Sequence, residues 1–159
     1  MPSKRKHGRR KSHWPTPRIY HPQYPEKYKG TLPIVIRSSL EARTFRKLDT
    51  SDSIITWGSE SVVIPYVSPL DGMKHRYFPD IIALVKVDEE TTKTLLIEIK
   101  PAGQCVQPKR GRKRERTYRN ELKVYLVNSA KWEAAKKWCD SQATPTKQVE
   151  FRLLTENDL

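Results

Sequence analysis

The amino-acid sequence predicts one α/β domain with a mixed β-sheet flanked by helices, preceded by an extended basic arm. Three observations lead to this prediction. The chain has 159 residues, which is enough for one domain with one hydrophobic core. Its middle part contains short apolar or alternating runs typical of β-strands, followed by a stretch with helical spacing. One more strand-like run closes the chain, and this mixture of elements is typical of α/β or α+β domains.

We expect the elements in the order α-β-β-β-β-α-α-β. The first helix begins after Ser38 or Ser39, either of which can cap it, and continues to about Lys47. The strand-like segments are 53–57, 61–67, 74–78 leading into 80–87, 93–100 and, near the C-terminus, 148–154.

The helical stretch begins at about Arg116. Four apolar or aromatic residues there recur at i, i+4, i+7 and i+8: Tyr118, Leu122, Tyr125 and Leu126. Asn128 or Ser129 can end this helix and cap a second one, in which Trp132 and Cys139 face inward. The sequence therefore predicts two helices before the last strand.

The N-terminal 29 residues form a separate basic arm in this prediction. Five prolines among the first 30 residues exclude a helix. Residues 14–28 are expected to lie extended on the domain, held by their aromatic side chains. Residues 30–159 then form the single domain, which contains a basic loop at 102–116.

Charge is concentrated in two segments of the chain, whose formal net charge is +13. Residues 1–25 contain seven Lys or Arg and no acid, and residues 109–119 contain seven against Glu115 alone. The other 17 basic and 17 acidic residues cancel. A polyanion is the natural partner of such a chain, because each phosphate that Lys or Arg neutralises releases counterions.

Other classes of function find no support. The sequence has no run of about 18 apolar residues, no apolar segment of a signal peptide, and no amphipathic face beside its basic clusters, so no membrane partner is expected. Cys105 and Cys139 are far apart and are interpreted as reduced thiols. A zinc site is not expected, because three of the four histidines lie in the arm.

The chemistry is expected where two neighbouring strands meet. Pro79–Asp80 opens one apolar run and Glu98-x-Lys100 closes the next. Alternation along a strand puts Glu98 and Lys100 on one face, and a turn near residue 89 puts Asp80 opposite residue 98 or 100. Two carboxylates and an ammonium so placed indicate a Mg²⁺ site for phosphodiester hydrolysis, with Mn²⁺ as a second suitable ion. The competing interpretation is a strand start and a solvated sheet edge.

These residues also carry a family resemblance. "FPD" with "EIKP" resembles the PD-(D/E)xK nucleases. The motifs "SSLEARTF", "WGSESVVIPYVSPLDG", "HRYFPD" and "IEIKP", in this order over roughly residues 30–101, resemble the head-completion nucleases of tailed bacteriophages, which are similar to the endonuclease subunit of cut-and-paste transposons. The resemblance implies a restriction-endonuclease-like core and a DNA endonuclease that acts in head completion and head–tail joining.

What the resemblance implies for single residues follows by position. Asp80 and Glu98 would bind the metal, the Ile99 carbonyl would be a further ligand, and Lys100 would be the catalytic lysine. Glu41 matches an additional acid on the first helix. The implied partners are DNA and phage head or neck proteins, such as portal or tail-completion proteins, in the virion or the host cytoplasm.

Two acids keep a second interpretation. Ser38-x-x-Glu41 is also a capping box, which needs no catalysis. Glu60 is a weaker site candidate that is expected to pair with Arg76 or a lysine instead.

Two basic segments are expected to bind the DNA backbone, which gives affinity without sequence preference. In the arm these residues are Lys4, Arg5, Lys6, Arg9, Arg10 and Lys11, and in the loop they are Lys109, Arg110, Arg112, Lys113, Arg114 and Arg116. Two rival hypotheses stay open. One is a structural head–tail joining protein with an inactive nuclease fold, and the other is a transposon-type nuclease subunit.

Overall fold

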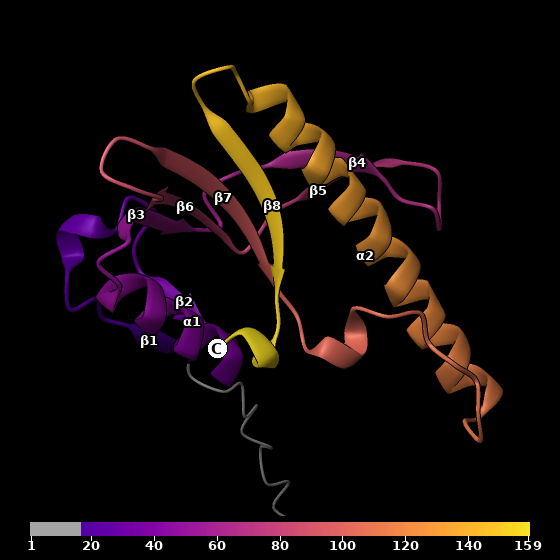
Figure 1. Ribbon diagram of the computed structural model, residues 1–159. Helices are drawn as coiled ribbons and strands as arrows, with labels where there is room; N and C mark the ends of the chain where they lie inside the picture. Colours follow the sequence, from indigo (N-terminus) through magenta and orange to yellow (C-terminus); the bar gives the residue numbers. More distant parts are fainter. Residues whose placement is uncertain (1–16) are drawn as a thin grey trace, which may run out of the picture.

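The computed structural model describes residues 17–159 and is organised around one mixed four-stranded sheet (Figure 1). Its strands lie in the order β3-β6-β7-β8, with β3, β6 and β7 antiparallel and β8 parallel to β7. The strands are β3 Ile54–Ser59, β6 Ile81–Lys86, β7 Thr92–Ile99 and β8 Gln148–Leu154. The predicted mixed sheet is thus confirmed.

Helices cover opposite faces of this sheet (Figure 1). Helix α1, Ser39–Thr50, packs on one face together with Trp57, Ile81 and Ile97. Helix α2, Glu115–Gln142, and the hairpin of β4 Ile64–Val67 and β5 Lys74–Tyr77 cover the other face around Leu96. The two faces of β7 therefore contribute alternate residues to two separate cores, as period-two alternation dictates.

The chain before the sheet is fastened to the first core. Strand β1, Arg18–Tyr20, pairs with β2, Ile34–Ile36, and the turn η1, Pro25–Lys27, lies between them. Tyr20 and Tyr28 meet the Trp57 ring edge-on, with centroids 6.0 and 4.8 Å apart. The expected aromatic anchoring is present in residues 17–28, whereas the earlier part of the arm, residues 1–16, lies outside the described residues.

Two predicted boundaries are wrong. The segment 74–87 is not one continuous strand, because β5 ends at Tyr77 and β6 begins at Ile81, after the imide nitrogen of Pro79 interrupts the pattern of donors. The helical stretch is one helix rather than two, because the Ser129 hydroxyl donates to the Tyr125 carbonyl 2.8 Å away within the continuous helix instead of capping a new one.

The second half of α2 packs on the sheet and the first half does not. Its buried residues all lie from the midpoint onward: Asn128, Trp132, Ala135 and Cys139. The first half extends beyond the edge of the sheet with the loop that follows β7 beside it (Figure 1). No helix in residues 17–159 is sufficiently long and apolar to cross a membrane.

Candidate active site

Asp80 stands at the start of β6 and is tied to the end of β7. The register of the β6–β7 pair runs from Lys86 opposite Thr92 to Ile81 opposite Ile97, and its continuation sets Asp80 opposite Glu98. The amide of Ile99 donates to Asp80 Oδ2 at 2.7 Å. The carboxylate is thereby held against the backbone of the segment that carries the other two predicted site residues.

Glu98 is a buried carboxylate with both oxygens engaged. Its exposed fraction is 4%, which is low for an acid and requires partners. Lys100 Nζ lies 2.9 Å from Oε1, and the Tyr77 hydroxyl donates to Oε2 at 2.7 Å. The Lys131 ammonium lies 5.6 Å from the centroid of the Tyr77 ring, so α2 supports the residue that holds Glu98.

Lys100 follows β7 directly, and β8 fixes its backbone. Its amide donates to the Leu154 carbonyl at 3.0 Å, and its side chain is partly exposed. Burial lowers the pKa of Lys100, but Glu98 and then Asp80 raise it by more, so the ammonium form is favoured overall. The structure therefore brings Asp80, Glu98 and Lys100 together, as the strand pattern predicted.

Burial and the neighbouring carboxylate disfavour the charged form of Asp80. Burial and then the charge of Glu98 raise its pKa from 3.8 to about 7, and the Ile99 amide and Lys100 only partly oppose the rise. A cation beside the two carboxylates would remove this penalty. Both side chains offer hard oxygen atoms, which suit Mg²⁺ or Mn²⁺. The donor set thus fits a divalent ion held by Asp80, Glu98 and the neighbouring Ile99 carbonyl.

Glu41 takes part in the capping of α1 in this structure, with Ser38 as the N-cap. The Ser38 hydroxyl accepts from the Glu41 amide at 3.0 Å, and the Glu41 carboxylate accepts from the Arg37 amide at 2.7 Å, one residue before the cap. Its charge still contributes to raising the pKa of Asp80. No three acidic, histidine or cysteine side chains in residues 17–159 form a group that could hold a metal. A role for Glu41 as a third acid stays a prediction.

Sequence reasoning missed the partner of Glu60. The expected pair with Arg76 or a lysine is wrong: Arg37 Nη1 and Nη2 donate to the two carboxylate oxygens of Glu60 at 2.7 and 3.1 Å. Arg76 instead lies 5.8 Å from the centroid of the Phe78 ring. The Glu60 amide donates to the Asp80 carbonyl at 2.9 Å, so this pair borders the site. The GSE turn was visible in the sequence, but its distant partner was not.

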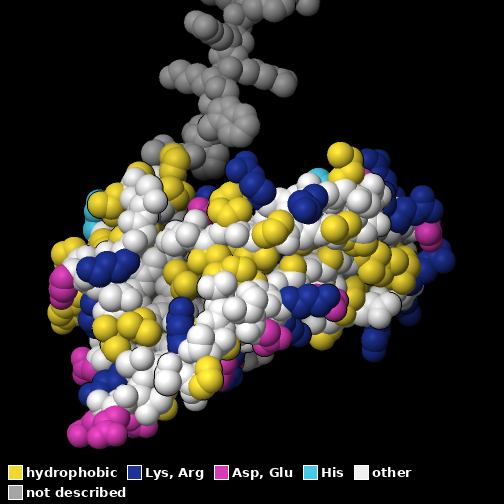
Figure 2. Space-filling model, turned by 90° about the horizontal axis from the view of Figure 1, so that it is seen from above, with side chains coloured by type: hydrophobic (Ala, Val, Ile, Leu, Met, Phe, Trp, Pro, Cys, Tyr) yellow, Lys and Arg dark blue, Asp and Glu magenta, His cyan; other side chains and the backbone are white. Residues whose placement is uncertain are grey.

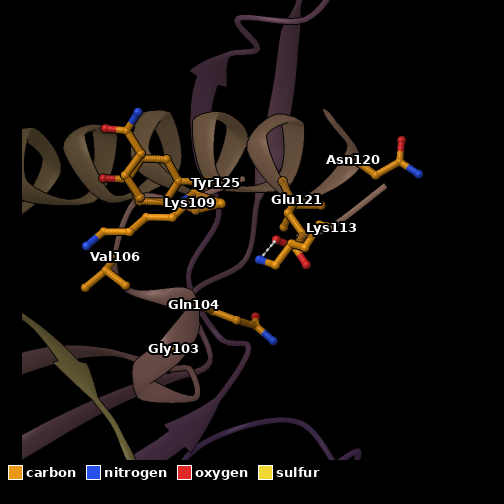
Figure 3. A pocket seen from close by; sticks show the side chains of 11 residues that line it. Gly103, Gln104, Val106, Lys109, Lys113, Asn120, Glu121 and Tyr125 are labelled. Atoms are coloured by element: carbon orange, nitrogen blue, oxygen red, sulfur yellow. Dashed lines mark hydrogen bonds and ion pairs between the residues drawn. The ribbon is translucent and has the colours of Figure 1, made fainter. Parts of the chain in front are cut away.

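The predicted basic loop and the first half of α2 form a projection that we call the basic finger, residues 102–125. Its loop and helix enclose a cavity of about 600 Å³ (Figure 3). Val106, Lys109 and Tyr125 lie on one side of the cavity, and the Lys113–Glu121 ion pair lies on the other. Lys and Arg side chains gather at the right-hand end of the molecule in Figure 2, the side on which Figure 1 places the finger and the β4–β5 hairpin.

The cations of the finger differ in their pairing. Arg110 pairs with Glu115 at 3.1 Å, and Lys113 pairs with Glu121. Four of the predicted DNA-binding residues form no ion pair within residues 17–159: Lys109, Arg112, Arg114 and Arg116. The predicted cations of the arm, Lys4 to Lys11, lie outside the described residues.

Comparison with known proteins agrees with this geometry. A family model described as TnsA-like endonuclease N terminal matches residues 51–156. The chain belongs to the TnsA-like endonuclease family. The head completion nuclease of Enterobacteria phage T4 is 34% identical to it over 143 residues, which cover 87% of this chain and 89% of that protein. No solved structure gives a match.

The match to the TnsA-like endonuclease family covers the strands that carry the site. Asp80, Glu98 and Lys100 lie within the matched residues, whereas Arg37 and Glu41 precede them. The predicted resemblance to head-completion nucleases and the predicted α/β fold with a restriction-endonuclease-like core are confirmed.

Proposed function

We propose that this TnsA-like endonuclease is a metal-dependent DNA endonuclease that acts in phage head completion and head–tail joining. The observation that carries the proposal is the convergence of Asp80, Glu98 and Lys100 at one end of the β6–β7 pair. The family match and the name of the phage T4 relative support the reaction class. Phosphodiester hydrolysis joins a water oxygen to phosphorus and breaks one ester P–O bond.

The residues of the chain divide the work between them. Asp80 and Glu98, with the Ile99 carbonyl, would hold Mg²⁺ or Mn²⁺. When bound, the ion would stabilise the negative charge that develops on the phosphate and favour ionisation of water. Lys100 orients the attacking water or a phosphate oxygen, because its ammonium donates toward Glu98 and remains partly exposed.

Tyr77 and the backbone keep these groups in place. The Tyr77 hydroxyl fixes one oxygen of Glu98 and the Lys100 ammonium fixes the other. The Ile99 amide fixes Asp80. A rigid arrangement of this kind is what electrostatic stabilisation of a transition state requires, since no reorganisation is then needed during the reaction.

The substrate is double-stranded or single-stranded DNA bound through its phosphates. The finger cations that form no ion pair within residues 17–159, and the basic residues of the arm, would neutralise backbone phosphates of the DNA. The finger begins two residues after Lys100, and its first cation, Lys109, lies nine residues after Lys100, so its cations would bind backbone phosphates away from the scissile bond. Portal or tail-completion proteins are the partners proposed for the biological role, in the virion or the host cytoplasm.

Plasmid cleavage tests the proposal. The wild-type protein should nick or cut supercoiled DNA with Mg²⁺ or Mn²⁺ and stop when EDTA is added. Asp80→Asn should lower the rate by more than about a hundredfold, because even the loss of a group that only orients a ligand costs 10–100-fold. DNA binding without metal should persist.

Glu89→Gln is the matched control for Asp80→Asn. Glu89 is an exposed acid in the turn at the opposite end of the β6–β7 pair, so its loss should leave cleavage unchanged. Normal cutting by Asp80→Asn would contradict the site. A wild-type protein that binds DNA but never cuts it would favour the rival role as a structural head–tail joining protein.

A further inference from the structure

Arg37 and Glu60 form a fork-to-fork ion pair beside the proposed site. Two guanidinium nitrogens meet the two carboxylate oxygens at 2.7 and 3.1 Å. The side chains are 56% and 40% exposed, so solvent and a large ligand can reach both. Neither residue has a role in the reaction as described above.

Glu60 adopts a backbone conformation that its residue type disfavours. Its φ is +49°, in the left-handed region, directly after the end of β3. Such a conformation is uncommon for a residue other than glycine, and residues held in sparsely populated regions cluster at functional sites. The hydrogen bond from the Glu60 amide to the Asp80 carbonyl, 2.9 Å long, ties this turn to the site.

A gain in folding stability from the Arg37–Glu60 ion pair does not explain the strained turn. Exposed ion pairs contribute roughly 0.2–1 kcal/mol. A strained backbone residue costs on the order of 1–3 kcal/mol. The bidentate geometry makes this pair stronger than an ordinary exposed pair, but the cost of the backbone conformation cancels that gain, so the turn is not explained by net stability. A use of the pair in binding accounts for both features.

Arg37 lies among the acids of the site. Its own amide donates to the Glu41 carboxylate at 2.7 Å, and its partner Glu60 is hydrogen-bonded to Asp80. The charges of Glu60, Glu41 and Asp80 raise the pKa of Arg37, although burial opposes this rise. The Arg37 guanidinium is thus tied through Glu60 to the backbone of Asp80 and lies within electrostatic reach of the Asp80 carboxylate.

We propose that Arg37 is a binding residue for a DNA backbone phosphate next to the scissile bond, and that the phosphate replaces the carboxylate of Glu60. The inference rests on the proposed function, because it takes DNA as the ligand. The guanidinium fork matches a carboxylate and a phosphate equally well in geometry, so one can exchange for the other. In the free protein Glu60 occupies both donors of the Arg37 fork and is the competitor that DNA displaces.

DNA affinity as a function of salt tests this exchange. The full-length protein is titrated with a fluorescent duplex in EDTA, so that no cleavage occurs. Arg37→Ala should weaken binding and lower the slope of log K against log[salt] by about 1, the value for one lost phosphate contact. Arg37→Lys should keep the slope but bind several-fold more weakly, because a lysine lacks the fork. Glu60→Gln should bind DNA more tightly than wild type.

Arg152→Ala is the matched control. Arg152 on β8 pairs with Glu150 at 3.0 Å, and the exposed fractions of these side chains, 56% and 39%, are nearly those of Arg37 and Glu60. Its loss removes the same charge from another part of the molecule, on β8, and should leave the slope unchanged. Arg37→Gln, checked by thermal unfolding, serves as the second variant if Arg37→Ala does not fold.

Two outcomes would overturn the exchange. One is a wild-type slope and affinity for folded Arg37→Ala or Arg37→Gln. The other is weakened binding by Glu60→Gln, which would make Glu60 a support for Arg37 rather than a competitor. Both readouts are independent of cleavage. A wild-type protein that does not cut DNA would defeat the proposed nuclease without affecting this test, and a cutting protein with an unaltered Arg37→Ala slope would defeat only the exchange.

Discussion

The acidic site and the basic finger place charge in opposite ways. In the site, Glu98 is buried and each of its carboxylate oxygens has one partner, Lys100 or Tyr77. A change of charge there therefore alters these buried contacts. In the finger, the cations are exposed, several form no ion pair within residues 17–159, and most lie in the loop that precedes α2 rather than on the sheet. We therefore expect the proposed chemistry to depend on burial and rigidity, and the proposed affinity for DNA to depend on exposed charge.

Replacing Tyr77 should show how strongly the buried site depends on its supports. Tyr77→Phe removes the hydroxyl that fixes Glu98 Oε2 and leaves that oxygen buried without its donor. We expect cleavage to fall about 10–100-fold, as for other groups that orient a metal ligand. The measurement is kcat and KM on a short duplex with saturating Mg²⁺.

Whether the loss of activity lies in kcat or in KM distinguishes a weakened site from weakened DNA binding. The fall should lie in kcat, with KM unchanged, since Tyr77 is buried and does not face DNA. Tyr66→Phe is the matched control, because Tyr66 lies in the same hairpin and also has Lys131 near its ring, 5.7 Å away, but does not contact Glu98. A fall in both variants would mean that packing of the hairpin, rather than Glu98, is responsible.

Neutralising the finger should give a smaller and salt-dependent effect. Arg112→Ala together with Arg116→Ala removes two unpaired cations and should lower the salt slope of DNA affinity by about 2. Cleavage at saturating DNA should not change, because neither residue touches the acids. The control is Lys136→Ala with Lys137→Ala, two exposed cations at the far end of the same helix. Equal slopes for the two double variants would remove any special role of the finger.

The last expected effect is on stability in the absence of metal and leaves the reaction aside. Asp80 loses its proton near 3.8 in the unfolded chain but only at about 7 in the folded protein. The folded state therefore holds the extra proton between these values, and stability from this group is lost as pH rises from about 4 through 7. In EDTA, Asp80→Asn should gain stability relative to wild type as pH rises, by an amount on the order of a few kcal/mol.

Thermal unfolding of both proteins from pH 4 to pH 8 measures this difference. Glu89→Gln should track the wild type across the whole range. Added Mg²⁺ at pH 8 should raise the Tm of the wild type and not that of Asp80→Asn, since only the former retains both carboxylates. A pH-independent stability difference between wild type and Asp80→Asn would show that the surroundings of Asp80 do not raise its pKa.

Much of the site could be predicted from the sequence, because Asp80, Glu98 and Lys100 all lie at the ends of one hairpin, β6–β7. Strand alternation and a polar turn were enough to set Asp80 opposite Glu98. The contact of Tyr77 with Glu98 was not predictable in this way, because it depends on how the β4–β5 hairpin folds over the sheet. The Arg37–Glu60 pair depends on the positive φ of Glu60. The sequence "GSE" does not predict a positive φ at its glutamate.

The predicted helix end at Asn128 or Ser129 was wrong for a related reason. Asn128 and Ser129 are good caps in isolation, but burial of Asn128 and Trp132 against the sheet keeps the helix continuous through them. The strands β1 and β2 were not predicted, because the sequence around β1 is rich in proline. Their pairing forms only through tertiary contacts. Local pattern thus located the chemistry better than the ends of the elements.

The most direct test of the account is a crystal structure of the protein soaked in Mn²⁺, with anomalous diffraction recorded. The account predicts one strong anomalous peak between the carboxylates of Asp80 and Glu98 and next to the Ile99 carbonyl, and no such peak in Asp80→Asn. Well-ordered side chains with no peak there, or a peak only at other acids such as Glu60, would contradict it.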